Sequence, residues 1–423
     1  MTIRNAVCLI VVCLLLPACA KNYVRPLPEG EVALRKITDP TRIPDFRPAF
    51  DCDKAALTQA ADQSLFYFAH PSSENYFPYL DVSHDRAIRS LEKFKEVVNS
   101  AVSADDLHRR IVDEFDVYES VGCDDRGTVF FTGYCTPIYE GSLKPTAECR
   151  YPLYKLPPDL MKGDKGITLG RKTRTGEIVP YYTRGELDGN RTLTGLELVY
   201  LKDRLDAYLV HVEGSARIRL PDGSLYDVGY AGSNGKEYKS LREMLMKDGK
   251  LKAERASLMG IKEYFKAHPE DLDVYLPRNE RYVFFQDMRG GPYGSLGVPV
   301  TMNCSLATDK TGSREIYPRG CVAFIQTKIP TASSGKTETR KYSGFILDQD
   351  TGGAIRSAGR ADIYMGIGPN AEMLAGHTAA EGRVYYIFVK QAMLDSSSAL
   401  EEAPAKGPAR AKPLPAVRTA PKM

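Results

Sequence analysis

The sequence predicts a mainly β chain of two domains with peripheral helices. Three observations support this prediction. The chain has 423 residues, which is long for one hydrophobic core and usual for two. From Thr128 onward, short runs rich in β-branched and aromatic residues alternate with glycine and proline, as strands and turns do. Helical periodicity is confined to a region before this part and to a short insert within it.

The N-terminal residues indicate export and a lipid anchor. A basic residue precedes an apolar run, Ala6 to Leu16, that is too short to span a bilayer and suits the core of a signal peptide. The run ends in Leu-Pro-Ala-Cys, which is similar to the lipobox of bacterial lipoproteins. We therefore expect removal of residues 1–18 and acylation of Cys19, which anchors the chain without spanning the membrane. An ordinary secretory signal with an incidental cysteine is the alternative.

The residue after the predicted anchor favours one of the two bacterial membranes. Ala20 stands where an aspartate would favour retention in the inner membrane. We therefore expect the chain on the periplasmic face of the outer membrane. Its net charge of +3 is close to balance, which argues against a nucleic-acid partner because such proteins usually carry a basic stripe.

Cysteine usage fits an oxidising compartment. Up to three disulfides are possible there, and their pairing cannot be read from the sequence. A zinc site is the alternative, but no C-x-x-C pair and no closely spaced histidines support it. We expect no metal and no cofactor. The cysteines that follow Cys19 are Cys52, Cys123, Cys135, Cys149, Cys304 and Cys321.

The first part of the exported chain is predicted to be a tether followed by helices. Residues 19–44 contain scattered prolines and no periodicity, as tethers do. Ile88 to Val98 has helical spacing. A second helix runs from Leu107 to Phe115, and the hydroxyl of Ser103 can cap it.

The remaining pattern is that of strands and turns with a helical insert. Thr128–Thr132, Tyr208–Val212, Tyr282–Phe285 and Val384–Val389 are predicted strands. Ile218–Leu220 and Tyr226–Val228 flank Pro-Asp-Gly and predict a hairpin. Helical spacing returns at Tyr238 to Leu245 and at Leu258 to Phe265. Residues 396–423 lack apolar periodicity and predict a disordered, basic tail.

Two aspartates among glycines form the densest chemical signal. Asp350 begins Asp-Thr-Gly-Gly, and Asp362 precedes Ile-Tyr-Met-Gly-Ile-Gly-Pro. Glycines on both sides indicate tight turns that bring carboxylates close to a ligand. A pair of carboxylates on a β scaffold favours glycoside cleavage. Aspartates that form turns or salt bridges are the alternative.

These residues resemble the C-terminal three-aspartate domain of the MltA family of lytic transglycosylases. The upstream aspartate of that domain corresponds to Asp309, in Ala-Thr-Asp-Lys. Residues 131–137, 211–216 and 230–236 resemble further family segments, in the same order. The resemblance covers roughly Asp113 to Lys390.

The resemblance implies a double-psi β-barrel with a second β domain inserted in it. The barrel would comprise residues 45–137 and 293–395, and the insert residues 138–292. A groove between the domains would hold a peptidoglycan glycan strand. The implied activity is cleavage of the MurNAc-β-1,4-GlcNAc bond with formation of a 1,6-anhydroMurNAc end. Proteins of cell-wall synthesis are further candidate partners.

The resemblance also implies roles for particular residues. Asp362 would act as acid and then as base, and we expect an apolar wall and the charge of Asp350 to raise its pKa. Asp350 and Asp309 would support it, or hold turns. Candidate substrate contacts are Thr132, Tyr134, Thr136, Ser233, Asn234 and Lys236.

Several of these roles have a purely structural alternative, and the sequence departs from the family pattern at two positions. Tyr134 could instead be a core aromatic residue, and residues 233–236 a simple glycine-rich turn. The family more often has tyrosine where Cys135 stands and glycine where Ala216 stands. A non-catalytic, expansin-like binder of peptidoglycan and a muramidase-type hydrolase remain the rival functions.

Overall fold

The computed structural model describes residues 21–394 apart from 164–166, 253–254, 256–257, 289, 310–315, 334–335 and 353–354. The predicted signal peptide, Cys19 and the predicted tail therefore lie outside the described residues. Within the described part, no helix has the length and apolarity needed to cross a membrane.

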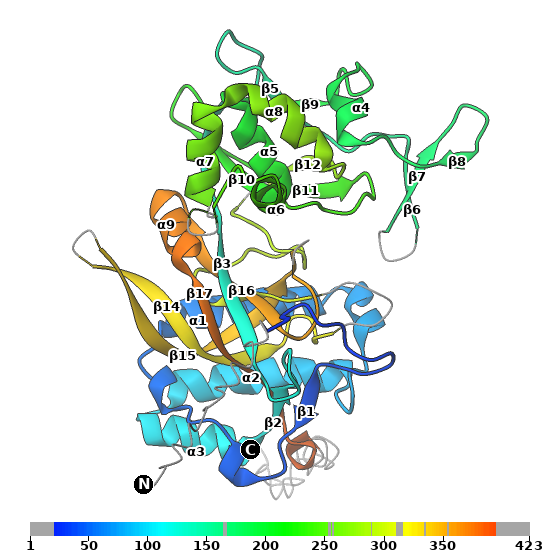
Figure 1. The fold of residues 1–423 in the computed structure, drawn as a ribbon. Helices are drawn as coiled ribbons and strands as arrows, with labels where there is room; N and C mark the ends of the chain where they lie inside the picture. The colour runs from blue at the N-terminus through cyan, green and yellow to red at the C-terminus, as the bar shows by residue number, and fades with distance from the viewer. Residues whose placement is uncertain are drawn as a thin grey trace, which may run out of the picture.

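A closed barrel of six strands forms the body at the bottom of Figure 1. Each strand pairs with the next, and the pairing of the last with the first closes the ring. In ring order the strands are β3 (Val129–Thr136), β16 (Arg360–Ile367), β13 (Ser305–Ala307), β15 (Lys336–Asp350), β14 (Val322–Ser333) and β17 (Ala379–Val389). The predicted mainly β fold with a barrel is confirmed.

Two strands extend the barrel sheet beyond β17. β2 (Phe115–Ser120) pairs with β17, and β1 (Leu34–Lys36) pairs with β2. The prediction of a tether over residues 19–44 is wrong where the structure describes this stretch. Leu34 and its neighbour Ala33 are buried in the barrel core, so hydrophobic burial holds this short strand although it shows no periodicity.

Three α-helices pack on the barrel sheet. They are α1 (Lys54–Phe68), α2 (His84–Ser100) and α3 (Ala104–Glu114), with short 3-10 turns at Pro40–Arg42, Arg47–Ala49 and Pro71–Tyr76. Two of them, α2 and α3, lie below the strands of this sheet in Figure 1. α2 and α3 were predicted, and the Ser103 hydroxyl accepts from the backbone N–H of Asp106 as expected. α1 was not predicted, because small residues such as Ala60 and Ala61 make much of its buried face.

The insert between β3 and β13 has its own sheet and its own hydrophobic core, separate from that of the barrel. Its strands, in sheet order, are β12 (Val283–Met288), β11 (Leu225–Ser233), β10 (Ser215–Arg219), β4 (Ile138–Ser142), β9 (Glu197–Leu201) and β5 (Tyr151–Tyr154). A smaller sheet contains β6 (Leu160–Lys162), β7 (Thr168–Lys172) and β8 (Ile178–Val179). The predicted hairpin, β10 with β11, is confirmed, with Gly223 at φ 82° in its turn.

Helices cover the insert sheet. They are α4 (Arg184–Asp188), α5 (Arg204–Glu213), α6 (Leu241–Lys247), α7 (Leu258–Ala267) and α8 (Leu272–Tyr275), with 3-10 turns at Pro269–Asp271 and Leu276–Arg278. α6 and α7 fall where helical spacing predicted them. The two domain boundaries proposed from the resemblance stay predictions.

The segment predicted as a strand at Tyr208–Val212 is instead the second half of α5. The carboxylate of Asp203 caps this helix by accepting from the N–H of Asp206, and Gly214 ends it at φ 78°. A cap at the start and a left-handed glycine at the end specify a helix. The β-branched valines near its end do not outweigh these signals.

A short helix that the sequence did not predict connects β16 and β17, the last two barrel strands in chain order. α9 (Pro369–His377) begins directly after β16 and faces the insert. The Nζ of Lys262 on α7 lies 2.6 Å from an Oε of Glu372 on α9, which links insert and barrel by an ion pair.

The cysteines carry free thiols throughout the described residues. Cys52 is half-buried, and Cys123, Cys135, Cys149, Cys304 and Cys321 are buried. The disulfides considered possible from the compartment are therefore not formed. Buried cysteine packs as a small apolar side chain and needs no partner to be accommodated.

Candidate active site

The two aspartates singled out in the sequence lie in register across three barrel strands. Asp350 on β15 and Asp362 on β16 both pair with Ala307 on the short strand β13 between them. Two strand spacings place their Cα atoms about 10 Å apart. Thr132 on β3 pairs with Asp362 from the other side, so closure of the barrel brings distant segments into one row.

One oxygen of Asp362 is held by two donors. The Thr132 hydroxyl donates to Oδ1, and Nη2 of Arg360 donates to the same Oδ1 at 3.1 Å and to the Thr132 hydroxyl oxygen at 2.9 Å. Oδ2 accepts from no residue that the structure describes, and the side chain is 17% exposed. The expected apolar wall is wrong, since a guanidinium lies there instead.

Asp350 is fixed by backbone groups. Its Oδ1 accepts from the N–H of Ser295 at 2.7 Å and from that of Thr351 at 2.8 Å. Burial, followed by the charge of Asp350, raises the pKa of the Tyr134 hydroxyl well above its usual value. Tyr134 also lies against Tyr364, with ring centroids 5.1 Å apart. Asp350 thus has a defined orientation next to an aromatic pair.

The third aspartate is not at the surface with the other two. Asp309 is 2% exposed, and its Oδ2 accepts from the N–H of Ser357 at 2.6 Å. Ser357 has φ 63°, a left-handed conformation that costs energy for a residue other than glycine. Asp309 therefore stabilises the turn that leads into β16, the strand that carries Asp362.

The candidate sugar contacts on β3 differ in what they touch. Thr132 bonds to Asp362, as described, and Tyr134 lies beside Asp350. Thr136 is 3% exposed and shares a hydrogen bond of 2.9 Å with the Tyr364 hydroxyl. The structure thus places Thr132 and Tyr134 at the carboxylates, and it gives Thr136 the role of orienting Tyr364.

The candidate contacts on the insert serve the insert itself. Asn234 is 3% exposed. Its amide donates to the carbonyls of Tyr182 and Glu280, and its oxygen accepts from the N–H of Tyr282 and of Lys236. These four bonds use both donors and both lone pairs of the side chain. The prediction that Asn234 contacts substrate is therefore wrong.

The neighbours of Asn234 also contact the insert. Ser233 is buried, its carbonyl accepts from the Thr168 hydroxyl and its own hydroxyl accepts from the N–H of Gly235. The carbonyl of Lys236 accepts from Arg281. Among the described residues, neither Ser233 nor Lys236 contacts Asp362. This geometry therefore does not support the prediction that they contact the substrate.

Two charged residues near Asp362 were not assigned roles from the sequence. Arg360 stands two positions before Asp362 on one strand, so both side chains project from the same face. Glu213 ends α5 and is solvent-exposed. Desolvation, then the charges of Glu372 and Asp362, raise the pKa of Glu213 to about 7. The charges that act on Glu213 come from both domains, since Glu372 and Asp362 lie on barrel elements and Lys262 lies on the insert helix α7.

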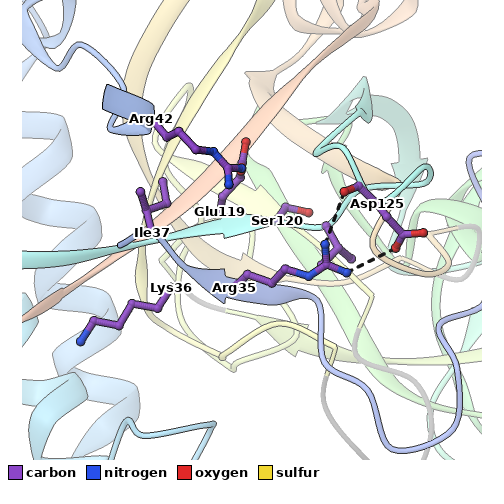
Figure 2. A pocket seen from close by; sticks show the side chains of 8 residues that line it. Arg35, Lys36, Ile37, Arg42, Glu119, Ser120 and Asp125 are labelled. Carbon is purple, nitrogen blue, oxygen red and sulfur yellow. Dashed lines mark hydrogen bonds and ion pairs between the residues drawn. The ribbon is translucent and has the colours of Figure 1, made fainter. Parts of the chain in front are cut away.

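Two cavities on the described part of the barrel lie away from these carboxylates. Figure 2 shows one of 140 Å³ between β1 and β2, lined by Arg35, Arg42 and Glu119 among others. A second, more open one of 460 Å³ adjoins it and reaches Arg383 and Tyr385 on β17. Neither touches Asp362, so the glycan groove stays a prediction.

Comparison with known proteins decides the family. The model of the MltA specific insert domain matches residues 130–286, and the model of the 3D domain matches residues 304–388. The chain is 30% identical to membrane-bound lytic murein transglycosylase A of Escherichia coli K12, over 64% of this chain and 69% of that protein. The chain belongs to the MltA family.

Further relatives of this MltA chain agree. The Vibrio cholerae membrane-bound lytic murein transglycosylase A is 34% identical over 62% of this chain and 66% of that protein, just under two thirds of its length. The crystal structure of the Agrobacterium tumefaciens membrane-bound lytic murein transglycosylase superposes with a TM-score of 0.68 at 25% identity, covering 86% of this chain and 99% of that one. E. coli MltA with bound chitohexaose gives 0.64 at 22% identity, over 88% and 99%, and shows the shared fold.

Proposed function

We propose that this MltA-family chain cleaves the MurNAc-β-1,4-GlcNAc bond of peptidoglycan and leaves a 1,6-anhydroMurNAc end. The observation that carries the proposal is that the two oxygens of one carboxyl group have different surroundings. Oδ1 of Asp362 is held by Thr132 and Arg360, while Oδ2 is unused among the described residues. A lytic transglycosylase needs one such oriented oxygen to move a proton twice.

The chemistry needs no activated water. Asp362 gives its proton to the glycosidic oxygen as the bond to N-acetylglucosamine breaks. The carboxylate then takes the proton of the 6-hydroxyl of the same muramic acid, whose oxygen attacks C1 and closes the ring. Asp350 pairs with Ala307 on the side of β13 opposite to Asp362. Its carboxylate stabilises the positive charge that develops at C1.

The ion pair with Arg360 sets a condition on this mechanism. A guanidinium stabilises the ionised form of a neighbouring carboxyl, whereas the first step needs the acid form. Arg360 contacts only one oxygen of this carboxyl, through a single nitrogen, which is weaker than a two-point fork. In the proposed mechanism the transferred proton is carried by Oδ2, the oxygen that Arg360 does not contact.

Product analysis on purified sacculi tests the proposal. A transglycosylase releases 1,6-anhydromuropeptides, a muramidase-type hydrolase releases reducing sugars, and an expansin-like binder releases neither. We expect anhydro products from the wild type and a loss of about 10²- to 10⁴-fold in Asp362→Asn, the range typical of a missing general acid and base. Asp85→Asn, an exposed position on α2 with a side chain 73% accessible, is the matched control. Full activity in Asp362→Asn overturns the assignment.

We also propose that acylated Cys19 attaches the chain to the outer membrane from the periplasmic side. Relatives named membrane-bound support attachment to a membrane. Metabolic labelling with a fatty acid, followed by separation of the two membranes, tests this. Label in the wild type and none in Cys19→Ala is the expected result, and label in both contradicts it.

A further inference from the structure

The segment that directly follows the predicted anchor lies on the catalytic strands. The Tyr23 ring stacks on Phe130 of β3, with centroids 4.7 Å apart and planes inclined by 24°. Its hydroxyl donates to Glu381 of β17 at 2.6 Å, and Nζ of Lys21 donates to the other oxygen of Glu381 at 2.8 Å. Phe130 and Glu381 are paired across β3 and β17, so Tyr23 bridges two adjoining strands.

The backbone of this segment also contacts the turn that leads into β16. The Ser357 hydroxyl donates to the carbonyl of Tyr23 at 3.2 Å. A Cβ at Gly359 would lie 2.4 Å from the same carbonyl oxygen, so only glycine permits this approach. Tyr23 is therefore in contact with three parts of the barrel that converge on Asp362.

Phe130 connects Tyr23 to the catalytic carboxyl. The guanidinium of Arg360 lies 5.6 Å from the centroid of the Phe130 ring, within the range of a cation–π contact. Arg360 and Phe130 are paired in register, as are Asp362 and Thr132 two residues further along the same strands. The contacts thus run without a gap from Tyr23 to Phe130, to Arg360 and to Oδ1 of Asp362.

We propose that Tyr23 is a positioning residue, which fixes Phe130 and Arg360 and thereby orients the Asp362 carboxyl. This inference rests on the proposed function of Asp362. Only three residues, Ala20, Lys21 and Asn22, separate Cys19 from Tyr23 in the sequence. The segment that orients the carboxyl is therefore also the segment that leads to the predicted lipid. From Lys21 onward, the contacts described above fix this segment to the barrel.

The phenol is suited to this role over a wide pH range. Its hydrogen bond to Glu381, with burial, raises the pKa of Tyr23 to about 12. The bonds from Lys21 and Tyr23 lower the pKa of Glu381. Donor and acceptor therefore keep their protonation states between weakly acidic and weakly alkaline pH, and the position of Phe130 does not change over that range.

The test compares variants of the full-length lipoprotein, purified in detergent, on sacculi. Loss of the ring in Tyr23→Ala is expected to lower kcat about tenfold, because small misplacement of a reacting group is costly, with KM within about twofold if substrate contacts persist. Tyr23→Phe keeps the stack on Phe130 and is expected to retain most of kcat. The pH profile of Tyr23→Ala should also shift on its acid side, which a loss of packing alone would not produce.

Controls separate this inference from the function on which it rests. Tyr76→Ala removes a tyrosine whose ring contacts an arginine, with Arg319 4.0 Å from its centroid, on a 3-10 turn outside the catalytic strands. It is expected to keep wild-type kcat. If Asp362→Asn is inactive while Tyr23→Ala has wild-type kcat and pH profile, Tyr23 is not a positioning residue. If Asp362→Asn is active, the proposed function itself fails.

Discussion

The barrel and the insert use similar polar side chains for opposite purposes. On the barrel, the hydroxyl of Thr132 donates to Asp362 at a partly exposed position. On the insert, every polar atom of Asn234 bonds to the insert's own backbone. Both residues belong to segments that resemble the family. A family segment thus marks a place in the fold, and only the hydrogen-bond inventory tells whether its side chains are available to a ligand.

The largest effect on stability is expected on the insert. Asn234→Ala leaves the carbonyl of Tyr182 and the N–H of Tyr282 without their partner in a buried place. The carbonyl of Glu280 loses one of its two donors and keeps the N–H of Arg184. We expect a loss of about 2–4 kcal/mol in the free energy of unfolding, since several buried groups lose their bonds together, with KM unchanged in the folded fraction. Urea unfolding and kinetics measure the two quantities. Asn190→Ala, which removes one exposed turn bond, is the control. A raised KM with unchanged stability would return Asn234 to the substrate contacts.

The matching substitution on the barrel is expected to affect the reaction instead. Thr132→Val keeps the shape of the side chain and removes the hydroxyl that orients Oδ1 of Asp362. A hydrogen bond to a charged group contributes about 1.5–3 kcal/mol, so kcat should fall by about 10- to 100-fold. Thr58→Val, which loses an exposed bond to Asn99, is the control. Unchanged kcat in Thr132→Val would show that Arg360 alone orients the carboxyl.

The sequence was informative where a signal is local. Pro-Asp-Gly between alternating runs predicted the β10–β11 hairpin, and the glycine-flanked aspartates Asp350 and Asp362 indicated the carboxylate row. Arg360 could have been found by the same reasoning, because residues two apart on a strand share a face. The contacts of Arg360 with Phe130 and of Phe130 with Tyr23 could not have been found in this way. They depend on barrel closure, which brings together strands far apart in the sequence.

Other errors have the same physical origin. The strand predicted at Tyr208–Val212 followed β propensity, which capping by Asp203 and Gly214 overrides. The apolar wall expected around Asp362 required knowledge of which side chain projects beside it. No signal in the sequence pointed to Glu213, because the charges that shift its pKa come from two domains rather than from its own segment.

Glu213 offers a test of how closely the insert approaches Asp362. The charged and titratable groups that act on it are Glu372 of α9, Asp362 of β16 and Lys262 of α7. Its pKa is raised to about 7, against 4.5 for an ordinary glutamate. A raised folded-state pKa means that the folded chain holds the proton more tightly than the unfolded chain. The stabilisation is complete below pH 4.5 and is lost as pH rises through 7.

Glu213→Gln removes this titration and mimics the protonated form. We expect the variant and the wild type to unfold at the same temperature near pH 4, and the variant to be the more stable above pH 7, with the difference growing between these limits. Thermal unfolding over this pH series measures it. Asp206→Asn removes a second group, whose pKa is raised to about 6, so that its titration can be distinguished from that of Glu213. A constant difference at all pH values would mean that Glu213 is not surrounded by the two domains.

The smallest effect is expected at the ion pair between the domains. Lys262 and Glu372 are about one quarter exposed, and such pairs contribute less than about 1 kcal/mol, so Lys262→Met should change stability little at neutral pH. Lys262 also lowers the pKa of Glu213, so its loss should move the pH midpoint found for Glu213 upward. Lys266→Met, an exposed position on the same helix, should leave that midpoint in place. A midpoint unmoved in Lys262→Met would show that salt and water screen the charge of Lys262 from Glu213.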